Sequence, residues 1–305
     1  MSNRYYFGIN GGGTHSRLAL TDREGRVLGL SEAGSTNIYS VTKEEVFENL
    51  SRLLDSALKN AGLLKQDLSA GCLGSAGLAR SGEIAIYRGF FDSILGPEFP
   101  VKLCSDGEIL LCGGLENLEG YCLIAGTGSV ALGRSYAGAL ARSGGHGYML
   151  GDEGSAAWMG RTAIARIFRS LENRDLTTNM LPAILQATGL SQSGELIRYV
   201  HHDADKAKIA KLAPVVTGAA RDGDPLALDI VRVGAGELSL LVKSVIGQSP
   251  WINRKELVLA GGVLENDELI SRSLKEILRR ELPDLEVSAP KGTALEGASM
   301  LAASL

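Results

Sequence analysis

The sequence predicts an α/β protein of two α/β domains, the second built on the same plan as the first. Three observations support this prediction. The chain has 305 residues, and beyond roughly 250–300 residues a single hydrophobic core tends to divide. Strand-like segments alternate with segments of helical periodicity. A pattern of strand, glycine turn and strand near the N-terminus returns at Gly120 as a weak internal repeat. We therefore expect one domain over 1–117 and a second over 118–305. In an alternative form of this division, the last helix packs back on the first domain.

The first domain is expected to begin with three short strands. Segments 4–9, 16–21 and 26–31 predict an antiparallel meander, with GGGT at the first bend. Apolar residues at helical spacing, a capping box of Thr42 and Glu45, and Gly62 as a stop predict a helix over 42–62. The other elements expected in this domain are a strand at 70–74, a helix at 83–95, a strand at 101–105 and a helix that begins near Asp106.

The second domain is expected to repeat the hairpin and to contain more helix. Its first segment, GYCLIAGTGSVALGRSYAG, is again strand, glycine turn and strand, with Gly and Thr at the bend as in YYFGINGGGTHSRLALTD. Strands are expected at 256–261 and 285–289. Helices are expected at 153–171, 205–221 with Pro214 inside, 225–247, 266–281 and 294–304.

Composition and charge exclude several classes of function. The chain is 45% hydrophobic and 22% charged, with a net charge of -4, which gives no general electrostatic reason to bind nucleic acid or an anionic membrane. The N-terminal segment lacks the features of a secretory signal, and no apolar run approaches transmembrane length. We therefore expect a cytoplasmic protein, in which an anionic ligand would need a local site.

The four cysteines lie in apolar surroundings without CxxC or CxxH spacing. This pattern favours buried free thiols over disulfides or a metal site. The residues concerned are Cys72, Cys104, Cys112 and Cys122.

The glycine-rich segment Gly11–Ser16 does not match either of the two common phosphate loops. It lacks the third glycine of GxGxxG and the lysine of a Walker loop, and the alternating residues that follow predict a strand, not a helix. The glycines are therefore expected at a hairpin tip, where main-chain N–H groups of Gly12 and Gly13 and the Thr14 hydroxyl can hold an anion. The alternative is an ordinary tight hairpin.

Two further glycine turns favour a ligand site over that alternative. Gly126, Thr127, Gly128 and Ser129 form a second glycine and hydroxyl turn, and the two hairpins are expected to face one another across a cleft and hold the phosphates of a nucleotide. The pair Gly261 and Gly262 follows a strand and precedes a helix, which suits a backbone that lies against a nucleotide.

Two carboxylates stand at positions suited to chemistry. Asp106 follows a strand and begins a helix, so it either faces a cleft as a proton acceptor or serves as the helix N-cap. Asp152 follows the glycine-rich loop RSGGHGYMLG, where a carboxylate can accept hydrogen bonds from sugar hydroxyls or simply favour the N-terminus of the next helix. The residues themselves leave both pairs of alternatives open.

The order of the motifs resembles one known family. GINGGGTHS, SDGEILLCGG, IAGTGSVALG, GGHGYMLGDEGSAAW and LAGGV, from about residue 7 to 299, are similar to the N-acetylglucosamine kinase group of the BadF/BadG/BcrA/BcrD ATPase family, within the actin/sugar kinase/Hsp70 superfamily. GDEGSA is the specific element. The resemblance implies two duplicated actin-like or ribonuclease H-like domains with an interdomain cleft, and a kinase that uses ATP and Mg²⁺ on an amino sugar.

The resemblance also implies roles for individual residues. Asp106 would be the general base that activates the sugar 6-hydroxyl, which settles its two local interpretations in favour of catalysis. ATP would be bound by Gly12, Gly13, Thr14, Gly126, Thr127, Gly128, Gly261 and Gly262. The sugar would be bound by Asn37, Asp106, Ser129, Gly144, Gly145, His146 and Asp152. A homodimer is an expectation of the same kind.

The chain departs from the family pattern at two positions. Asn10 stands where the superfamily usually has an acid that helps to hold hydrated Mg²⁺, so a neutral amide would contact the metal through water, as a weaker ligand. His146 stands where similar proteins often have Trp, and it either hydrogen-bonds the sugar or its acyl group or is a surface residue.

Two other classes of function are compared with the kinase. An ATP-driven activator of a dehydratase or reductase needs exposed cysteines for an iron–sulfur cluster, which the apolar surroundings of these cysteines disfavour. A non-catalytic sugar sensor would rest on Asn10 alone. Among kinase substrates, the sequence leaves N-acetylglucosamine, N-acetylmuramic acid, glucosamine and N-acetylmannosamine open.

Overall fold

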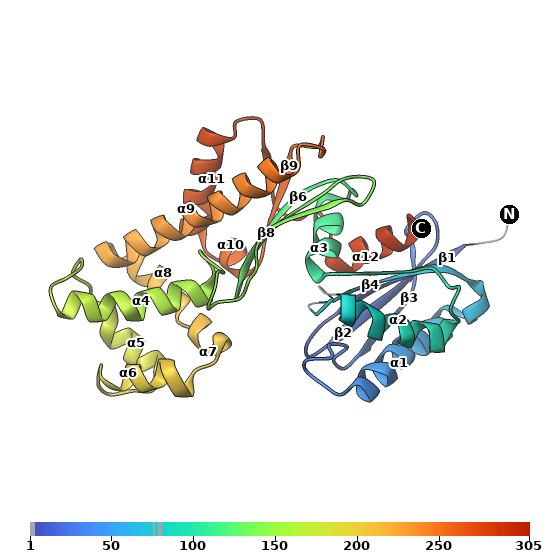
Figure 1. Cartoon of the computed structure of the whole chain (residues 1–305), viewed down its shortest axis with the longest axis horizontal. Coiled ribbons are helices and arrows are strands. Elements are labelled where there is room, and N and C mark those ends of the chain that lie inside the picture. Colours follow the sequence, from blue (N-terminus) through green and yellow to red (C-terminus); the bar gives the residue numbers. More distant parts are fainter. Residues whose placement is uncertain (1–3, 76, 79–80) are drawn as a thin grey trace. The chain divides into compact units, whose positions relative to one another are not determined.

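The computed structural model describes residues 4–75, 77–78 and 81–305 and divides into two compact units (Figure 1). Unit 1 comprises the chain as far as Gly120 together with Arg134–Ala139 and Pro290–Leu305. Unit 2 comprises Tyr121–Gly133 and Leu140–Ala289. Each unit contains one five-stranded sheet with flanking helices, which confirms the predicted class of two α/β domains.

The sheet of unit 1 has the strand order β3-β2-β1-β4-β5. β1 pairs with β2, and β2 with β3, in antiparallel fashion, as the predicted meander requires. β4 pairs in parallel with both β1 and β5. The strand bounds are Tyr5–Gly11 for β1, Ser16–Thr21 for β2, Val27–Ala33 for β3, Leu68–Ser75 for β4 and Val101–Cys104 for β5.

Helices cover both faces of this sheet. In Figure 1, α1 and α2 lie on one face, and α3 and α12 lie on the other. The side chains of Phe7 and Ile9 point into the core with α1 and α2, while Gly8 between them faces α12 at Ser299. The helix bounds are Lys43–Ala61 for α1, Ser81–Leu95 for α2, Asp106–Leu115 for α3 and Ala294–Ala303 for α12, with a 3₁₀ turn at Lys65–Asp67.

α1 forms where its sequence pattern predicts. The Thr42 side chain accepts a hydrogen bond from the Glu45 N–H, and Gly62 ends the helix in the left-handed region at φ 68°. Six apolar side chains on its inner face are buried, which stabilises the helix through tertiary packing. They are Val46, Leu50, Leu53, Leu54, Ala57 and Leu58.

The sheet of unit 2 has the order β10-β9-β6-β7-β8, which repeats the arrangement of unit 1. Three strands that are consecutive in sequence lie side by side, and the two later strands extend the sheet beyond the first of them, with β9 parallel to both β6 and β10. The strand bounds are Gly120–Ala125 for β6, Ser129–Arg134 for β7, Leu140–Gly144 for β8, Glu256–Ala260 for β9 and Glu286–Ser288 for β10.

Unit 2 contains more helix than the sequence predicts. The expected helices correspond to α4 at Ala156–Leu171, α9 at Pro225–Gln248 and α11 at Glu268–Glu281. Short helices that the sequence analysis missed are α5 at Met180–Thr188, α6 at Glu195–Arg198, a π-helical turn at Tyr199–Asp203 and α10 at Gly262–Asn266.

The prediction of one helix over 205–221 is wrong, because the segment forms two helices. α7 runs from Lys206 to Ala210, and α8 runs from Ala213 to Arg221. Pro214 lies in the first turn of α8, where its missing N–H costs no helical hydrogen bond. Residues of both helices line the cavity described below.

The four cysteines are buried free thiols, as their surroundings predict. The Cys72 and Cys104 sulfur atoms lie 3.8 Å apart on neighbouring strands, and burial raises the pKa of the Cys112 thiol to about 12. Within the described residues, no helix is both long and apolar enough to cross a membrane.

Candidate active site

The first glycine turn is the hairpin tip between β1 and β2 in unit 1. The Gly12 N–H donates to the Ser16 hydroxyl at 3.2 Å, and the Ser16 hydroxyl lies 2.8 Å from that of Thr36. The Gly12 carbonyl accepts from the Thr36 N–H at 3.3 Å. These bonds fix the base of the turn, and Gly13 and Thr14 are exposed at its tip.

The segment that carries Asn37 is attached to the same turn. Tyr87 is buried, and its hydroxyl donates to the Thr36 carbonyl at 2.6 Å and accepts from the Ile38 N–H at 3.2 Å. Burial raises the pKa of the Tyr87 hydroxyl, so the hydroxyl keeps its proton and remains a donor. The Asn37 side-chain oxygen accepts from the Tyr39 N–H at 2.9 Å.

Asp106 lies at the exposed start of α3 and does not cap the helix. The cap is Ser105, whose side chain accepts from the Glu108 N–H at 3.2 Å. The Asp106 Oδ1 atom accepts from the adjacent Gly107 N–H at 2.9 Å. The local alternative, in which Asp106 serves as the N-cap, is therefore wrong, and its carboxylate stands at the carboxyl end of β5.

The second glycine turn, between β6 and β7 in unit 2, is tied to the start of α4. The Gly126 N–H donates to the Gly128 carbonyl at 2.9 Å, and the Gly126 carbonyl accepts from the Ala156 N–H at 2.9 Å. Ser129 is buried, and its hydroxyl donates to the Glu153 carbonyl at 2.7 Å. Thr127 is exposed at the tip.

The third glycine pair lies directly beside the second turn, because β6 and β9 are parallel neighbours. Gly261 has φ 95°, and a Cβ atom there would come within 2.5 Å of the Ala125 carbonyl oxygen. A Cβ atom at Gly126 would lie 3.8 Å from the Gly262 nitrogen. Glycine is therefore needed at Gly261 for both its dihedral angles and its close approach to β6.

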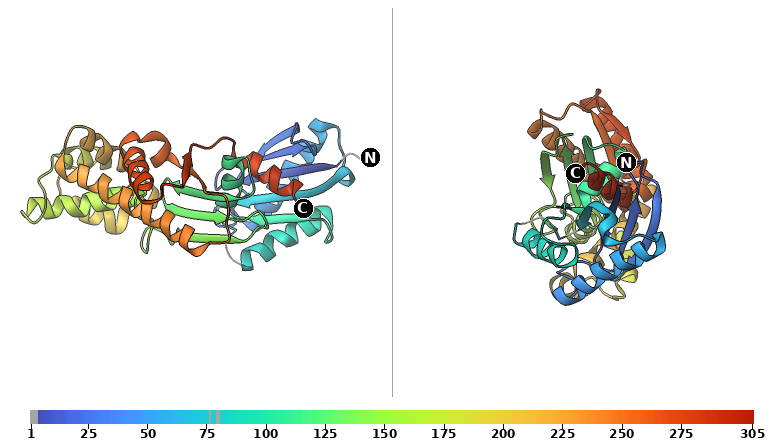
Figure 2. Two further views of the ribbon diagram at one scale, coloured as in Figure 1. Left: turned by 90° about the horizontal axis from the view of Figure 1, so that it is seen from above. Right: turned by 90° about the vertical axis from the view of Figure 1, so that its right-hand side faces the viewer.

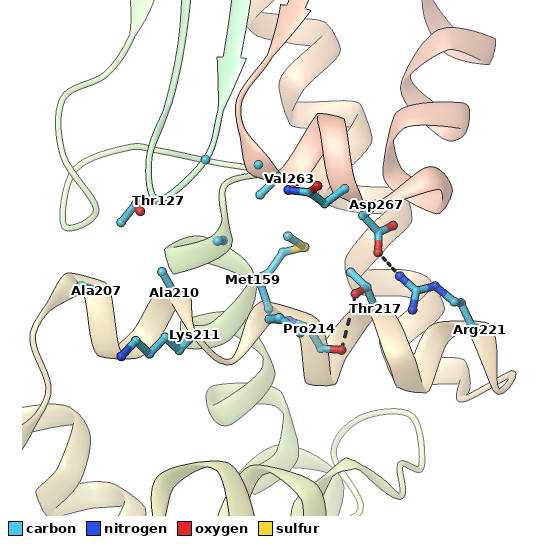
Figure 3. A pocket seen from close by; sticks show the side chains of 15 residues that line it. Thr127, Met159, Ala207, Ala210, Lys211, Pro214, Thr217, Arg221, Val263 and Asp267 are labelled. Carbon is cyan, nitrogen blue, oxygen red and sulfur yellow. Dashed lines mark hydrogen bonds and ion pairs between the residues drawn. The ribbon is translucent and has the colours of Figure 1, made fainter. Parts of the chain in front are cut away.

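A cavity of about 680 Å³ opens between these two turns (Figure 3). Thr127 lies at one end, Met159 and Val263 lie along its length, and an ion pair between Arg221 and Asp267 at 2.6 Å lies at the other end. Its volume is typical of small-molecule sites. The centre of the cavity is apolar, with the glycine turns at one end and the ion pair at the other. This arrangement suits a nucleoside in the centre, with its phosphates toward Thr127.

The loop after β8 is shaped by two glycines and one arginine. Gly144 and Gly145 have φ values of 75° and 70°. The Arg142 guanidinium donates to the Gly144 carbonyl at 3.2 Å and to the Gly145 carbonyl at 2.6 Å. Arg142 thereby fixes the carbonyls of the predicted sugar loop, next to which His146 is exposed.

Asp152 is buried and held in an unusual conformation. It is 2% exposed and has φ 61°, in the left-handed region that a non-glycine residue rarely adopts. Its Oδ1 atom accepts from the Ser129 N–H at 3.3 Å, and its Oδ2 atom lies 2.7 Å from the Lys206 ammonium. These contacts tie Asp152 to the second glycine turn.

Comparison with known proteins decides the family. The chain matches the BadF/BadG/BcrA/BcrD ATPase family over residues 7–302. It belongs to this family. The resemblance seen in the sequence motifs is therefore confirmed, and membership implies that the chain uses ATP.

Individual relatives of the family are similar over their whole lengths. An N-acetylmuramic acid/N-acetylglucosamine kinase of Clostridium acetobutylicum is 34% identical, with 99% of each chain covered. An N-acetyl-D-glucosamine kinase of Dictyostelium discoideum is 25% identical, with 99% of this chain and 98% of the relative covered. A crystal structure of a protein provisionally assigned as an N-acetylglucosamine kinase, from Chromobacterium violaceum, has a TM-score of 0.73 at 27% identity, with 99% of each chain covered.

The described side chains do not form a metal site by themselves. Among the described residues, no group of three or more His, Cys, Asp and Glu side chains is placed to hold a metal ion. Asn10 lies on β1, paired in register with Arg17 and Gly74, and offers a neutral amide.

The structure brings together only part of the predicted site. Gly126, Thr127 and Gly262 line one cavity. The Ser129 N–H, at the end of the second turn, donates to Asp152. Thr14, Asn37 and Asp106 belong to unit 1, and their joint site with unit 2 stays a prediction.

Sequence reasoning missed Lys206 and Arg142. Lys206 reaches Asp152 from a distant helix, and Arg142 was read only as part of the glycine loop. No local signal identifies the first. The second stands two residues before paired glycines, where a side chain that binds main-chain carbonyls could have been considered.

Proposed function

We propose that this chain is an ATP-dependent kinase that phosphorylates the 6-hydroxyl of N-acetylglucosamine. The observation that carries the proposal is the cavity of unit 2, bounded by the glycine turns at Gly126 and Gly261, in a chain of an ATPase family. Relatives that cover nearly the whole chain are named as kinases of N-acetylated amino sugars, which supports the same reaction here.

In the proposed reaction, Asp106 accepts the proton of the sugar 6-hydroxyl, and the hydroxyl oxygen attacks the γ-phosphorus of ATP. The bond to the bridging oxygen breaks and ADP leaves. The glycine turns hold the phosphates with main-chain N–H groups, because phosphoryl transfer depends on positioning and on charge stabilisation. Mg²⁺, when bound, neutralises charge on the phosphates, and Asn10 is the residue proposed to contact its water shell.

The sugar is proposed to bind to groups from both units. Asp152 of unit 2 would accept hydrogen bonds from sugar hydroxyls, and the Asn37 amide of unit 1 can both donate to and accept from them. The fixed loop at Gly144 and Gly145 would contact the ring. His146, exposed on that loop, is the proposed neighbour of the acyl group. Ser129 would act mainly by holding the loop, since its hydroxyl already donates to Glu153.

N-acetylmuramic acid is the second candidate substrate. It is favoured by the relative from Clostridium acetobutylicum, whose name includes both sugars. The two sugars differ by a lactyl ether at the 3-hydroxyl, so one loop contact can decide between them.

The proposal is tested by ADP release and product mass with ATP, Mg²⁺ and a panel of sugars. We expect N-acetylglucosamine to gain one phosphoryl group at the 6-position, and glucose to react poorly. Glucosamine, N-acetylmannosamine and N-acetylmuramic acid complete the panel. ATP binding without any phosphorylated sugar would contradict the kinase and favour the sensor. We also propose a cytoplasmic location, where ATP is available.

Replacing Arg142 should weaken sugar binding without slowing the chemical step. In Arg142→Met the carbonyls of Gly144 and Gly145 lose their charged donor. If the sugar loses about 1 kcal/mol of binding free energy because the loop is less fixed, its KM rises about fivefold and kcat stays nearly unchanged. Steady-state kinetics with sugar varied at saturating ATP measures both.

Arg232→Met is the matched control for Arg142. Arg232 is an exposed arginine of the same unit whose guanidinium pairs with Asp229 on α9 at 2.6 Å. We expect its KM to equal that of the unmodified chain. An unchanged KM in Arg142→Met would show that the guanidinium does not position the loop.

A further inference from the structure

Lys206 lies where the candidate nucleotide cavity meets Asp152. It begins α7, and the next residue, Ala207, lines the cavity at the same end as Thr127 (Figure 3). The Lys206 ammonium is 2.7 Å from the Asp152 Oδ2 atom. A Cβ atom at Gly128 would lie 2.7 Å from both of these atoms, so the ion pair rests against the backbone of the glycine turn.

The two partners of this ion pair differ in exposure. The Asp152 side chain is 3% exposed, whereas that of Lys206 is 35% exposed. The carboxylate is fixed by its backbone and by the Ser129 N–H. The ammonium stands on a flexible stem of four carbons and can turn toward a new partner at little cost.

An arriving nucleotide would supply that partner. Phosphates held at Gly126–Gly128 would lie beside the ammonium, and a triphosphate carries more negative charge than one carboxylate. The electrostatic attraction therefore favours the phosphates once ATP is bound. Asp152, relieved of its cation, then has an oxygen available to accept a hydrogen bond from a sugar hydroxyl.

We propose that Lys206 is a positioning residue that couples the two substrates: it holds Asp152 in the empty protein and moves to the terminal phosphates of ATP, which prepares Asp152 for the sugar. The sugar half of this inference rests on the proposed function, whereas the nucleotide half does not. ATP should therefore tighten sugar binding, and the sugar should tighten ATP binding by the same factor.

Calorimetric titration of the full chain, with Mg²⁺ present, tests the coupling. The non-hydrolysable analogue AMP-PNP should lower the Kd for N-acetylglucosamine about fivefold or more. AMP, which lacks the terminal phosphates, should leave that Kd unchanged. An equal effect of AMP and AMP-PNP, or no effect of either, would overturn the proposal.

Substitution of Lys206 distinguishes a role in binding the phosphates from a purely structural role. Lys206→Met should raise the Kd for AMP-PNP about fivefold or more while leaving that for AMP unchanged, and sugar affinity should become independent of the nucleotide. Lys206→Gln removes the charge but keeps a polar side chain, so it gives the same test if the first variant does not fold. Wild-type values in either folded variant would show that Lys206 is only structural.

The control is Lys208→Met, on the same helix. Its ammonium donates to the Asp203 carbonyl at 2.8 Å and is exposed, so both Kd values should match those of the unmodified chain. A chain that binds AMP-PNP but no sugar would contradict the proposed function. In that case the Kd values of Lys206→Met still test the nucleotide half. If Lys206 binds the terminal phosphates, the substitution raises the Kd for AMP-PNP and leaves the Kd for AMP unchanged.

Discussion

Asp106→Asn should lower kcat by about 10²- to 10⁴-fold, the usual contribution of a positioned general base. The amide has nearly the shape of the carboxylate but cannot take a proton from the sugar hydroxyl. The helix should stay intact, because Ser105 and not Asp106 caps it. The new side-chain oxygen can still accept from the Gly107 N–H. Steady-state kinetics, together with titration of AMP-PNP and sugar, would show lost turnover with binding retained.

Asp55→Asn provides the matched control for this experiment. Asp55 is a carboxylate of unit 1 on α1, and its side chain pairs with Lys65 at the surface at 3.2 Å. Exposed pairs of this kind contribute little to stability, so kcat should be unchanged. If Asp106→Asn kept kcat within tenfold of the unmodified chain, another group would have to accept the proton.

Local patterns predict the elements whose stability depends on local signals. The helix with Thr42 at its start and Gly62 at its end is found as expected, because cap, periodicity and stop agree. The hairpins around Gly12 and Gly126 are found for the same reason, since glycine and alternating residues define their turns. The pattern also identified the turns that line the cavity of unit 2.

Features that depend on distant segments were not predictable in this way. The short helices α5 and α6 carry few periodic residues and are held by packing in the core of unit 2, where Ile184 and Leu196 are buried. The break between α7 and α8 is not evident from the pattern, because helical periodicity continues across it and Pro214 in fact lies in the first turn of α8. The ion pair of Asp152 and Lys206 joins segments far apart in sequence, so only the fold brings it together.

The position of Asp106 depends on a contact between two helices that lie far apart in the sequence. α3, which begins at Asp106, lies side by side with α12 (Figure 2). A Cβ atom at Gly297 on α12 would come within 1.9 Å of the Ile109 carbonyl oxygen. A Cβ atom at Gly113 on α3 would come within 1.8 Å of the Thr293 carbonyl oxygen. Both obstacles are backbone atoms, so neither can move aside alone.

Gly297→Ala should therefore destabilise unit 1 by about 1–3 kcal/mol, since overpacking forces a backbone shift. The shift would also move α3 and with it Asp106, so kcat should fall together with stability. Urea unfolding should be followed by far-UV circular dichroism, because both tryptophans, Trp158 and Trp251, lie in unit 2 and do not report on unit 1. The expected result is a lower midpoint with an unchanged slope.

Gly89→Ala is the matched control, because it adds the same methyl group to a helix of the same unit without a steric obstacle. Gly89 lies within α2, and a Cβ atom there meets no atom within 4 Å. Alanine favours the helix over glycine by up to about 1 kcal/mol, so this variant should be as stable as the unmodified chain or more so. If Gly297→Ala behaved like Gly89→Ala, close packing of α12 would not be what holds α3, and the position of Asp106 would depend on β5 alone.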